Sequence, residues 1–364
     1  MKRIGLGLLG LLVLLAAYLS LWPVPVAPIA WTAPPAAAYT GVHAVNTRLS
    51  GLTLIPLGQE SGPEHVAVGR DGKLYAAVLG GNILRMNLDG SGQEVYASTG
   101  GRVLGFDFDA AGRLIAADAV KGLLAIGTDR KVSVLANQVD GDPIRYADAV
   151  VVARDGRIYF SDASGRFAPA RWGTYEAAVL DIVEQRATGR ILEHDPASGR
   201  TRVVVKGLSF ANGVALSQDE QHLFIAETGR YRIWKVAVSA QTLDVGSASP
   251  QARVLLDNLP GYPDNLMRGQ EGRVWVGFSG PRTKAVDDMA NKPFLRSLTL
   301  RLPRALWPLP KPYGHVFAFN EDGQVVADLQ DPSGSYPEST GVTETADRLI
   351  IQNLHQKVLG WKAR

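Results

Sequence analysis

The sequence predicts an all-β fold, a six-bladed β-propeller that follows a membrane-spanning helix and carries short helical insertions as a cap. Two observations predict it. From about residue 42 onward, apolar and polar residues alternate between turns rich in Gly and Asp, with little helical periodicity. One turn-and-strand phrase recurs six times, as RDGKLYAA (70–77), AAGRLIAA (110–117), RDGRIYFS (154–161), QDEQHLFIAE (218–227), QEGRVWVG (270–277) and TADRLIIQ (345–352).

The spacing of these phrases favours a propeller over a sandwich. Successive copies start about 40 to 75 residues apart, which suits four-stranded blades with insertions. A β-sandwich is the alternative, but it does not require one phrase to recur in this way. We therefore assign residues 42–364 to a six-bladed β-propeller.

The N-terminus predicts a membrane anchor. Residues 4–22 contain no charge, and about 20 apolar residues suffice for a helix to cross the hydrocarbon core. Lys2 and Arg3 precede this run and favour a cytoplasmic N-terminus. A cleaved signal peptide is the alternative, but its apolar region is usually shorter and ends at small residues. We assign residues 1–22 to an uncleaved single-pass anchor, with the propeller extracytoplasmic, as in the periplasm.

Two kinds of segment interrupt or precede the propeller pattern. Residues 23–41 are rich in proline, which predicts an extended, semi-rigid linker that holds the body away from the bilayer. Residues 172–190 have apolar residues at helical spacing, and residues 284–308 contain FLRSLTLRLPRALWPLP. We expect both insertions to lie over the propeller as caps that shape access to a site.

Composition excludes several classes of function. The 364 residues include 38 Lys and Arg against 35 Asp and Glu, too weak and too scattered an excess for a nucleic-acid-binding surface. There is no cysteine, which excludes disulfides, thiolate nucleophiles and zinc bound by cysteine.

Oxygen-bearing side chains recur at one position of the repeat. Counting back eight residues from the turn glycine, or its counterpart, reaches Glu64, Asp148, Asn212 and Asp264 in four repeats, and Leu104 and Thr340 in the others. Equivalent positions of successive blades surround the propeller axis, so these four side chains should converge at one mouth of the channel. Each residue also suits a local role, since Asn212-Gly213 is a good turn sequence.

The convergence predicts a calcium site. Like charges placed together repel and raise one another's pKa unless a cation lies among them. Carboxylate and amide oxygens, without His or Cys, favour Ca²⁺ over zinc. We expect Glu64, Asp148, Asn212 and Asp264 to bind the ion, with Asn265 as a fifth contributor.

These phrases resemble those of a known superfamily, the propellers that unite strictosidine synthase-like proteins, SMP-30/gluconolactonases and, more distantly, paraoxonases. The resemblance is carried by DGRIYFSDASGRF (155–167), TGRILEHDPASGRTRVVVKGLSFANGVALSQDE (188–220), AETGRYRIWK (226–235), NLPGYPDNL (258–266) and LQDPSG (329–334). Within the superfamily, the chain resembles the strictosidine synthase-like branch that includes adipocyte plasma membrane-associated protein and its bacterial relatives. The resemblance implies calcium-ligand positions at Glu64, Asn212 and Asp264. It leaves the role of Asp148 open, because the relatives usually have Asn there.

The resemblance implies a membrane-anchored, calcium-dependent hydrolase of small-molecule esters or lactones, with Asp148 and Asp264 in catalytic roles. Paraoxonases have a catalytic His where this sequence has Leu104, so Asp148 is our candidate base. One alternative is a non-enzymatic binding propeller that calcium only stabilises. Another is a condensing lyase of the strictosidine synthase type, which uses a glutamate in the last blade, near Glu338 and Glu344.

Overall fold

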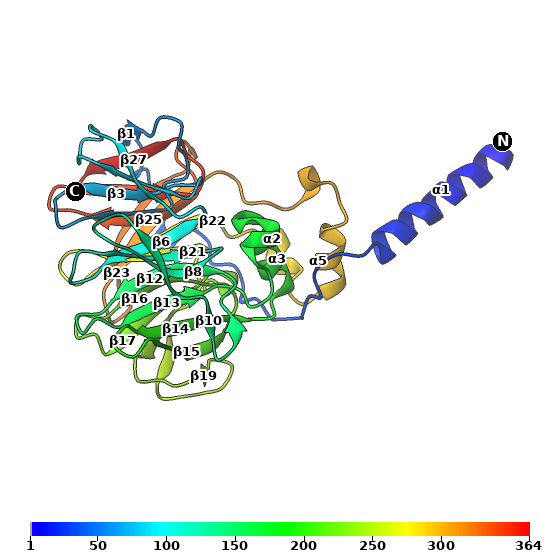
Figure 1. Cartoon of the computed structure of the whole chain (residues 1–364). Helices are drawn as coiled ribbons and strands as arrows, with labels where there is room; N and C mark the ends of the chain where they lie inside the picture. The colour runs from blue at the N-terminus through cyan, green and yellow to red at the C-terminus, as the bar shows by residue number, and fades with distance from the viewer. Residues whose placement is uncertain (1) are drawn as a thin grey trace.

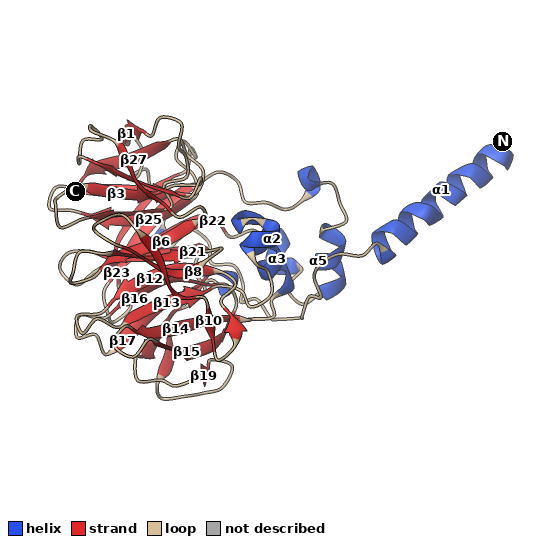
Figure 2. Cartoon of the chain, in the orientation of Figure 1, coloured by secondary structure: helices blue, strands red, loops and turns tan. Residues whose placement is uncertain are grey.

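A computed structural model describes residues 2–364 and confirms the six-bladed propeller (Figures 1 and 2). In each blade the successive strands pair edge to edge. Blade 1 contains β2 (His65–Val68), β3 (Leu74–Ala77), β4 (Asn82–Met86) and β5 (Glu94–Ser98). Blade 2 contains β6 (Val103–Phe108), β7 (Leu114–Asp118), β8 (Gly122–Ile126) and β9 (Val132–Ala136). Blade 3 contains β12 (Ala147–Val152), β13 (Ile158–Asp162), β14 (Gly189–Asp195), β15 (Arg200–Leu208) and the short parallel strand β19 (Leu243–Asp244).

The second half of the ring repeats the arrangement. Blade 4 contains β16 (Ala211–Leu216), β17 (His222–Glu227), β18 (Arg232–Ala237) and β20 (Ala252–Leu256). Blade 5 contains β21 (Gly261–Arg268), β22 (Val274–Pro281), β23 (Gly314–Phe319) and β24 (Val325–Asp331). Blade 6 contains β25 (Ser339–Glu344), β26 (Arg348–Asn353), β27 (Val358–Ala363) and β1 (Thr53–Pro56). A separate hairpin joins β10 (Gln138–Val139) to β11 (Asp142–Pro143).

The ring is closed by strands from both ends of the propeller sequence. β1 pairs antiparallel with β27, with Thr53 opposite Trp361 and Pro56 opposite Val358. The first strand of each blade contacts the first strand of the next, so β2, β6, β12, β16, β21 and β25 form the inner ring. This radial arrangement leaves only short, protected sheet edges. It also brings the repeat position that carries the predicted ligands to the axis.

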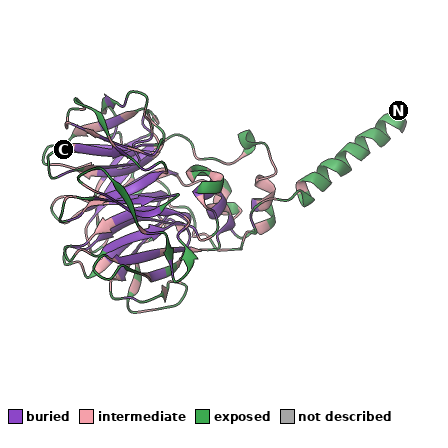
Figure 3. Ribbon diagram, in the orientation of Figure 1, coloured by how far each residue is buried: buried purple, intermediate pink, exposed green. Residues whose placement is uncertain are grey.

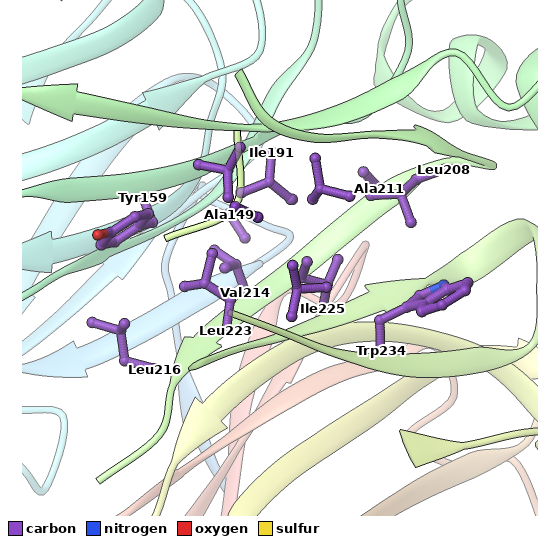
Figure 4. Packing of buried hydrophobic residues seen from close by; sticks show 14 of the residues in the cluster. Ala149, Tyr159, Ile191, Leu208, Ala211, Val214, Leu216, Leu223, Ile225 and Trp234 are labelled. Atoms are coloured by element: carbon purple, nitrogen blue, oxygen red, sulfur yellow. The ribbon is translucent and has the colours of Figure 1, made fainter. Parts of the chain in front are cut away.

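Apolar side chains pack between the blades, and much of the propeller strands is coloured as buried in Figure 3. Figure 4 shows one such cluster, in which Ile191 and Leu208 of blade 3 pack against Val214, Ile225 and Trp234 of blade 4. Completely burying a side chain of this size stabilises the fold by about 1.5–3 kcal/mol. The blade-to-blade packing therefore holds the inner strands at fixed positions around the axis.

The helices lie outside the propeller, at one end of it (Figure 2). α1 (Lys2–Leu21) is long and apolar enough to cross a membrane and is unburied along its span. The predicted cap insertions are also helical. They form α2 (Pro169–Trp172), α3 (Thr174–Glu184), α4 (Lys284–Asp288), α5 (Pro293–Thr299) and the 3₁₀ turn η3 (Arg304–Leu306), while η1 (Gly41–His43) and η2 (Thr228–Arg230) are single turns elsewhere.

The proline-rich segment 23–41 was predicted to be an extended linker that holds the body away from the bilayer, but part of it packs against the body. Val26 is buried in an apolar cluster with Leu180 of α3. The backbone N–H of Ala27 donates to the Glu184 carboxylate (2.8 Å), and that of Ile29 donates to the Glu184 carbonyl (2.9 Å). Proline stiffens the segment, but its valines can pack against the apolar surface of the cap. The segment is therefore packed against the cap from Val24 onward.

A buried ionic cluster fixes the start of the propeller sequence to blade 5. The Asp328 carboxylate lies 2.6 Å from His43 Nδ1 and 2.8 Å from His315 Nε2, and it accepts a hydrogen bond from Asn46 (3.0 Å). Burial alone would raise the pKa of Asp328, but the hydrogen bonds from His315 and His43 outweigh it and hold the pKa well below its usual range.

We expect Asp328→Asn to lower the free energy of unfolding by about 2 kcal/mol at neutral pH, because it removes charge-assisted hydrogen bonds. The carboxylate has a depressed pKa, so its contribution is present above the unfolded-state pKa of about 3.9 and disappears as pH falls below it. The difference between variant and wild type in urea unfolding should therefore shrink in acid. Asp322→Asn, in an exposed turn of the same blade, is the matched control, and equal stability of both variants would contradict the assignment.

Candidate functional site

Irregularities in the inner strands place the predicted residues at the axis. The pairing register shifts between Ala147 and Val150 in β12, between Ala211 and Val214 in β16, and between Pro263 and Leu266 in β21. A β-bulge bends its strand and changes the direction of a side chain. Asp148, Asn212 and Asp264 lie within these bulges. This explains why residues at the same position of successive repeats come together in one site.

The four predicted side chains line one cavity. Glu64, Asp148, Asn212 and Asp264 all contribute to its wall, and its volume is about 480 Å³. Each of these residues is at most 5% exposed. Glu64 directly precedes β2, where its N–H donates to the Ala77 carbonyl (3.1 Å). Four blades therefore contribute oxygen atoms to one cavity.

The three carboxyl groups lie close enough to affect one another. Burial, and then the charge of Asp264, raise the pKa of Glu64 to about 8. Burial raises the pKa of Asp264 well above its usual range, and Asp148 adds to the rise. The pKa of Asp148 is raised by burial and by Glu64. Neutral pH thus disfavours three ionised carboxylates here unless a positive charge accompanies them.

The donor set fits a hard divalent cation. The amide oxygen of Asn212 is buried and has no hydrogen-bond partner among the described residues. A buried acceptor without a partner is costly, and a cation would satisfy it. If all three carboxylates are ionised, the single positive charge of Arg102 leaves the site with a net charge of −2. Oxygen ligands of this kind favour Ca²⁺.

Arg102 is a member of the site that the sequence pattern did not reveal. It lies in the loop before β6, with Nη2 3.4 Å from the Glu64 carboxylate, and it is 6% exposed. Its Nε has no hydrogen-bond partner. Arg102 is two residues before Leu104, which occupies the repeated position in this blade, so counting along the repeats could not find it. It partly neutralises the carboxylates.

In blades 2 and 6, the residue at the repeated position is not one of the four predicted ligands and has another role. Leu104 lies at a bulge in β6 and lines the cavity as an apolar side chain. In blade 6 the Thr340 hydroxyl donates to the backbone carbonyl of Glu64 (2.8 Å). Thr340 therefore positions the Glu64 backbone.

Asn265 is not among the residues that line the cavity. Its amide group donates to the Glu64 carbonyl (3.0 Å) and lies 3.4 Å from the Gln352 side-chain oxygen. Its own amide oxygen is buried without a partner. Because Asn265 follows Asp264 in the bulge, it points toward blades 1 and 6. Its contacts support the backbone of Glu64.

Asn212-Gly213 is not a hairpin turn. Both residues lie inside β16, and the positive φ angle belongs to Phe210 (55°). A Cβ atom on Gly213 would lie 2.3 Å from the Leu266 nitrogen and 2.5 Å from the Asp264 carbonyl oxygen. The glycine is needed because the backbones of blades 4 and 5 touch there, one residue from a predicted ligand.

A second titratable pair lies on the cavity wall. His355 and Glu338 both line the cavity, and His355 Nδ1 is 2.8 Å from the Glu338 carboxylate. That hydrogen bond raises the pKa of His355. His65, in contrast, is buried against Phe106 with ring centroids 4.7 Å apart. His355 follows β26 and lies outside the repeated phase, so the sequence pattern did not single it out.

The cap supplies the opposite, mostly apolar wall. Tyr175, Val179 and Ile182 of α3 line the same cavity as the carboxyl cluster. Trp307 and Leu309, from the segment after η3, complete this wall. The predicted caps therefore cover the site, and they offer an apolar surface to whatever binds there.

Comparison with known proteins places this geometry in a family. Residues 65–292 match the model described as "SMP-30/Gluconolactonase/LRE-like region", and residues 41–86 match "Strictosidine synthase-like, N-terminal". The chain belongs to the SMP-30/gluconolactonase-like family. Strictosidine synthase-like 7 of Arabidopsis thaliana is 33% identical over 79% of this chain and 76% of its own length.

Two further relatives match this chain in part. Strictosidine synthase-like 13 of Arabidopsis thaliana is 35% identical over 61% of this chain, and adipocyte plasma membrane-associated protein of Salmo salar is 32% identical over 61%. The match spans about half the length of these two relatives, 54% and 53% respectively.

Solved structures share the fold of this chain. A gluconolactonase from Xanthomonas campestris has a TM-score of 0.61 and 20% identity, covering 94% of this chain and 99% of its own. Regucalcin from Agrobacterium tumefaciens, a calcium-binding protein, has a TM-score of 0.52 and 14% identity, covering 85% and 95%. At these identities the likeness concerns the fold.

Proposed function

We propose that the chain is a membrane-anchored, calcium-dependent hydrolase of esters or lactones. The observation that supports this function best is the convergence of four oxygen-bearing side chains from four blades at the base of a covered cavity, one of them with an unpartnered amide oxygen. In this proposal α1 spans the membrane with its N-terminus on the cytoplasmic side, and the propeller lies on the other side.

The roles follow from position. Glu64, Asn212 and Asp264 hold the ion, and Asp148 is a further ligand or the general base. When bound, calcium would polarise the substrate carbonyl and stabilise the oxyanion. As the base, Asp148 would be kept ionised by the charge of the ion and would accept the proton of the attacking water in the cavity that it shares with the ligands. The apolar cap excludes bulk water and strengthens these interactions.

Hydrolysis of an ester and lactone panel by the full chain in nanodiscs tests this function. The full chain is used because residues 24–31 pack against the cap. We expect turnover of aryl esters or lactones that a calcium chelator abolishes and added Ca²⁺ restores, with Mg²⁺ less effective because it requires a stricter octahedral geometry. Turnover that is unchanged by chelation would contradict the proposal.

His355 is the second candidate for the base. A histidine base must be unprotonated, so kcat/KM would rise with pH through the pKa of His355, which Glu338 raises. If His355 is the base, Glu338→Gln should move the rise in kcat/KM to lower pH. The substitution removes the carboxylate whose hydrogen bond raises the pKa of His355. If Asp148 is the base, the pH profile of Glu338→Gln should overlay that of the wild type.

A condensing lyase of the strictosidine synthase type is the second candidate function. Glu338, in the loop that leads into blade 6, lines the cavity, and the lyase uses a glutamate in its last blade. A mixture of an aryl-ethylamine and an aldehyde, added to the same panel, distinguishes the two functions. Condensation that continues in chelator, without ester or lactone hydrolysis, would favour the lyase.

A further inference from the structure

We propose that the outer face of the cap docks on the bilayer that holds α1, and that the cavity takes lipophilic esters or lactones directly from that bilayer. The second part depends on the proposed hydrolase function, whereas the first does not. The docking face, called the cap rim, comprises the exposed residues Phe294, Leu295, Leu306 and Leu309 together with the basic residues Lys292, Arg304 and Lys311.

The cap rim is unusually apolar for an exposed surface. Phe294 is 56% exposed and Leu306 is 64% exposed. Outside α1 and the cap, most of the exposed large apolar residues are valines, such as Val134 on β9 at 55%. Scattered exposed valines need no explanation, but phenylalanine and leucines gathered in one short segment indicate a contact surface.

The charge of residues 292–311 favours a membrane as the partner of the cap rim. Residues 292–311 contain five basic residues and no acidic residue. Lys292, Arg304 and Lys311 are exposed, and Trp307 lies between the leucines. Apolar side chains flanked by Lys, Arg and Trp are typical of segments that lie at the interface of a bilayer. Basic side chains there can also reach lipid phosphates.

The position of α1 supports the same partner. Arg301 Nε donates to the Trp22 carbonyl (2.7 Å), one residue after α1 ends. Val24 already packs against the apolar cluster of the cap. Two extended residues span about 7 Å at most, so a bilayer around α1 would begin next to the cap. Figure 1 shows α2, α3 and α5 between the propeller and α1.

The same segment forms part of the cavity wall. Trp307 and Leu309 line the cavity, whereas Phe294 and Leu306, their neighbours on the cap rim, do not. A molecule dissolved in the bilayer can therefore pass from the lipid surface along one short segment to the carboxyl cluster. This geometry favours substrates with a long hydrocarbon chain over water-soluble ones.

Site-directed labelling tests the docking. Because the chain has no cysteine, Leu306→Cys and Val134→Cys each give one attachment point for a nitroxide, in the full chain in phosphatidylcholine nanodiscs, with or without phosphatidylglycerol. We expect the label at 306 to be accessible to oxygen and shielded from a water-soluble relaxation agent, and the label at 134 to show the reverse. Water-like accessibility at both positions would overturn the docking.

Kinetics in the same nanodiscs test the route to the cavity. Phe294→Ser combined with Leu306→Ser should lower kcat/KM for a long-chain ester by about tenfold or more, with an acetyl ester of the same alcohol unaffected. An equal loss for both esters would overturn the route. If no ester is hydrolysed, the proposed function fails, and the labelling result still decides whether the cap docks.

Discussion

Replacing Asp264 by Asn is expected to lower kcat/KM for the best ester or lactone by about a thousandfold or more. The substitution keeps the size of the side chain but removes one of the three carboxylates of the cluster formed by Glu64, Asp148 and Asp264. Loss of a metal ligand removes several kcal/mol of transition-state stabilisation, and each 1.36 kcal/mol corresponds to about tenfold in rate. Calcium should also no longer raise the melting temperature of the variant.

Asp155→Asn is the matched control for this experiment. Asp155 lies in a turn of blade 3 with its side chain 56% exposed, so its loss should change neither hydrolysis nor the effect of calcium. The assignment is contradicted if Asp264→Asn hydrolyses the substrate at the wild-type rate. If instead calcium still stabilises Asp264→Asn and hydrolysis alone is lost, Asp264 acts in the reaction without holding the ion.

The second large effect concerns stability. Gly213→Ala should lower the free energy of unfolding by about 3 kcal/mol or more, at the upper end of overpacking effects. Its Cβ would lie 2.3 Å from the Leu266 nitrogen and 2.7 Å from the Asn265 carbonyl carbon, and neither backbone atom can move without shifting β21. Because Asn212 and Asp264 flank this contact, calcium affinity should fall together with the melting temperature.

Gly80→Ala is the control for the glycine substitution. The Cβ at position 80 would meet only the end of the Glu60 side chain, at 3.5 Å, which can move away. Thermal unfolding with and without calcium measures both variants. If Gly213→Ala is as stable as Gly80→Ala, the backbones of blades 4 and 5 are not in the close contact described.

The fold could be predicted from the sequence because each blade repeats one local pattern. Phrases such as RDGRIYFS combine a tight turn with a buried strand, and six copies leave few ways to bury their apolar faces. The same regularity predicted the shared phase of Asp148, Asn212 and Asp264. The bulges that direct these side chains to the axis were not visible, since a bulge depends on pairing with the next strand.

Residues outside the repeat could not be found in this way. Arg102 and His355 reach the cavity from loops, so no spacing connects them with Glu64. Asn212-Gly213 was interpreted as a turn because local preference is all that a dipeptide offers, yet contact between blades requires its glycine. The segment 23–41 was predicted to be a spacer from its prolines, although its valines pack against a cap distant in sequence.

The central claim is that four blades hold one calcium ion between Glu64, Asp148, Asn212 and Asp264. A crystal structure of the protein grown with calcium, with anomalous scattering to locate the ion, tests it most directly. The account predicts one ion at the base of the cavity, about 2.3–2.6 Å from oxygens of Glu64, Asn212 and Asp264. It would be contradicted by a cavity without an ion at saturating calcium, in which Arg102 alone balances the carboxylates.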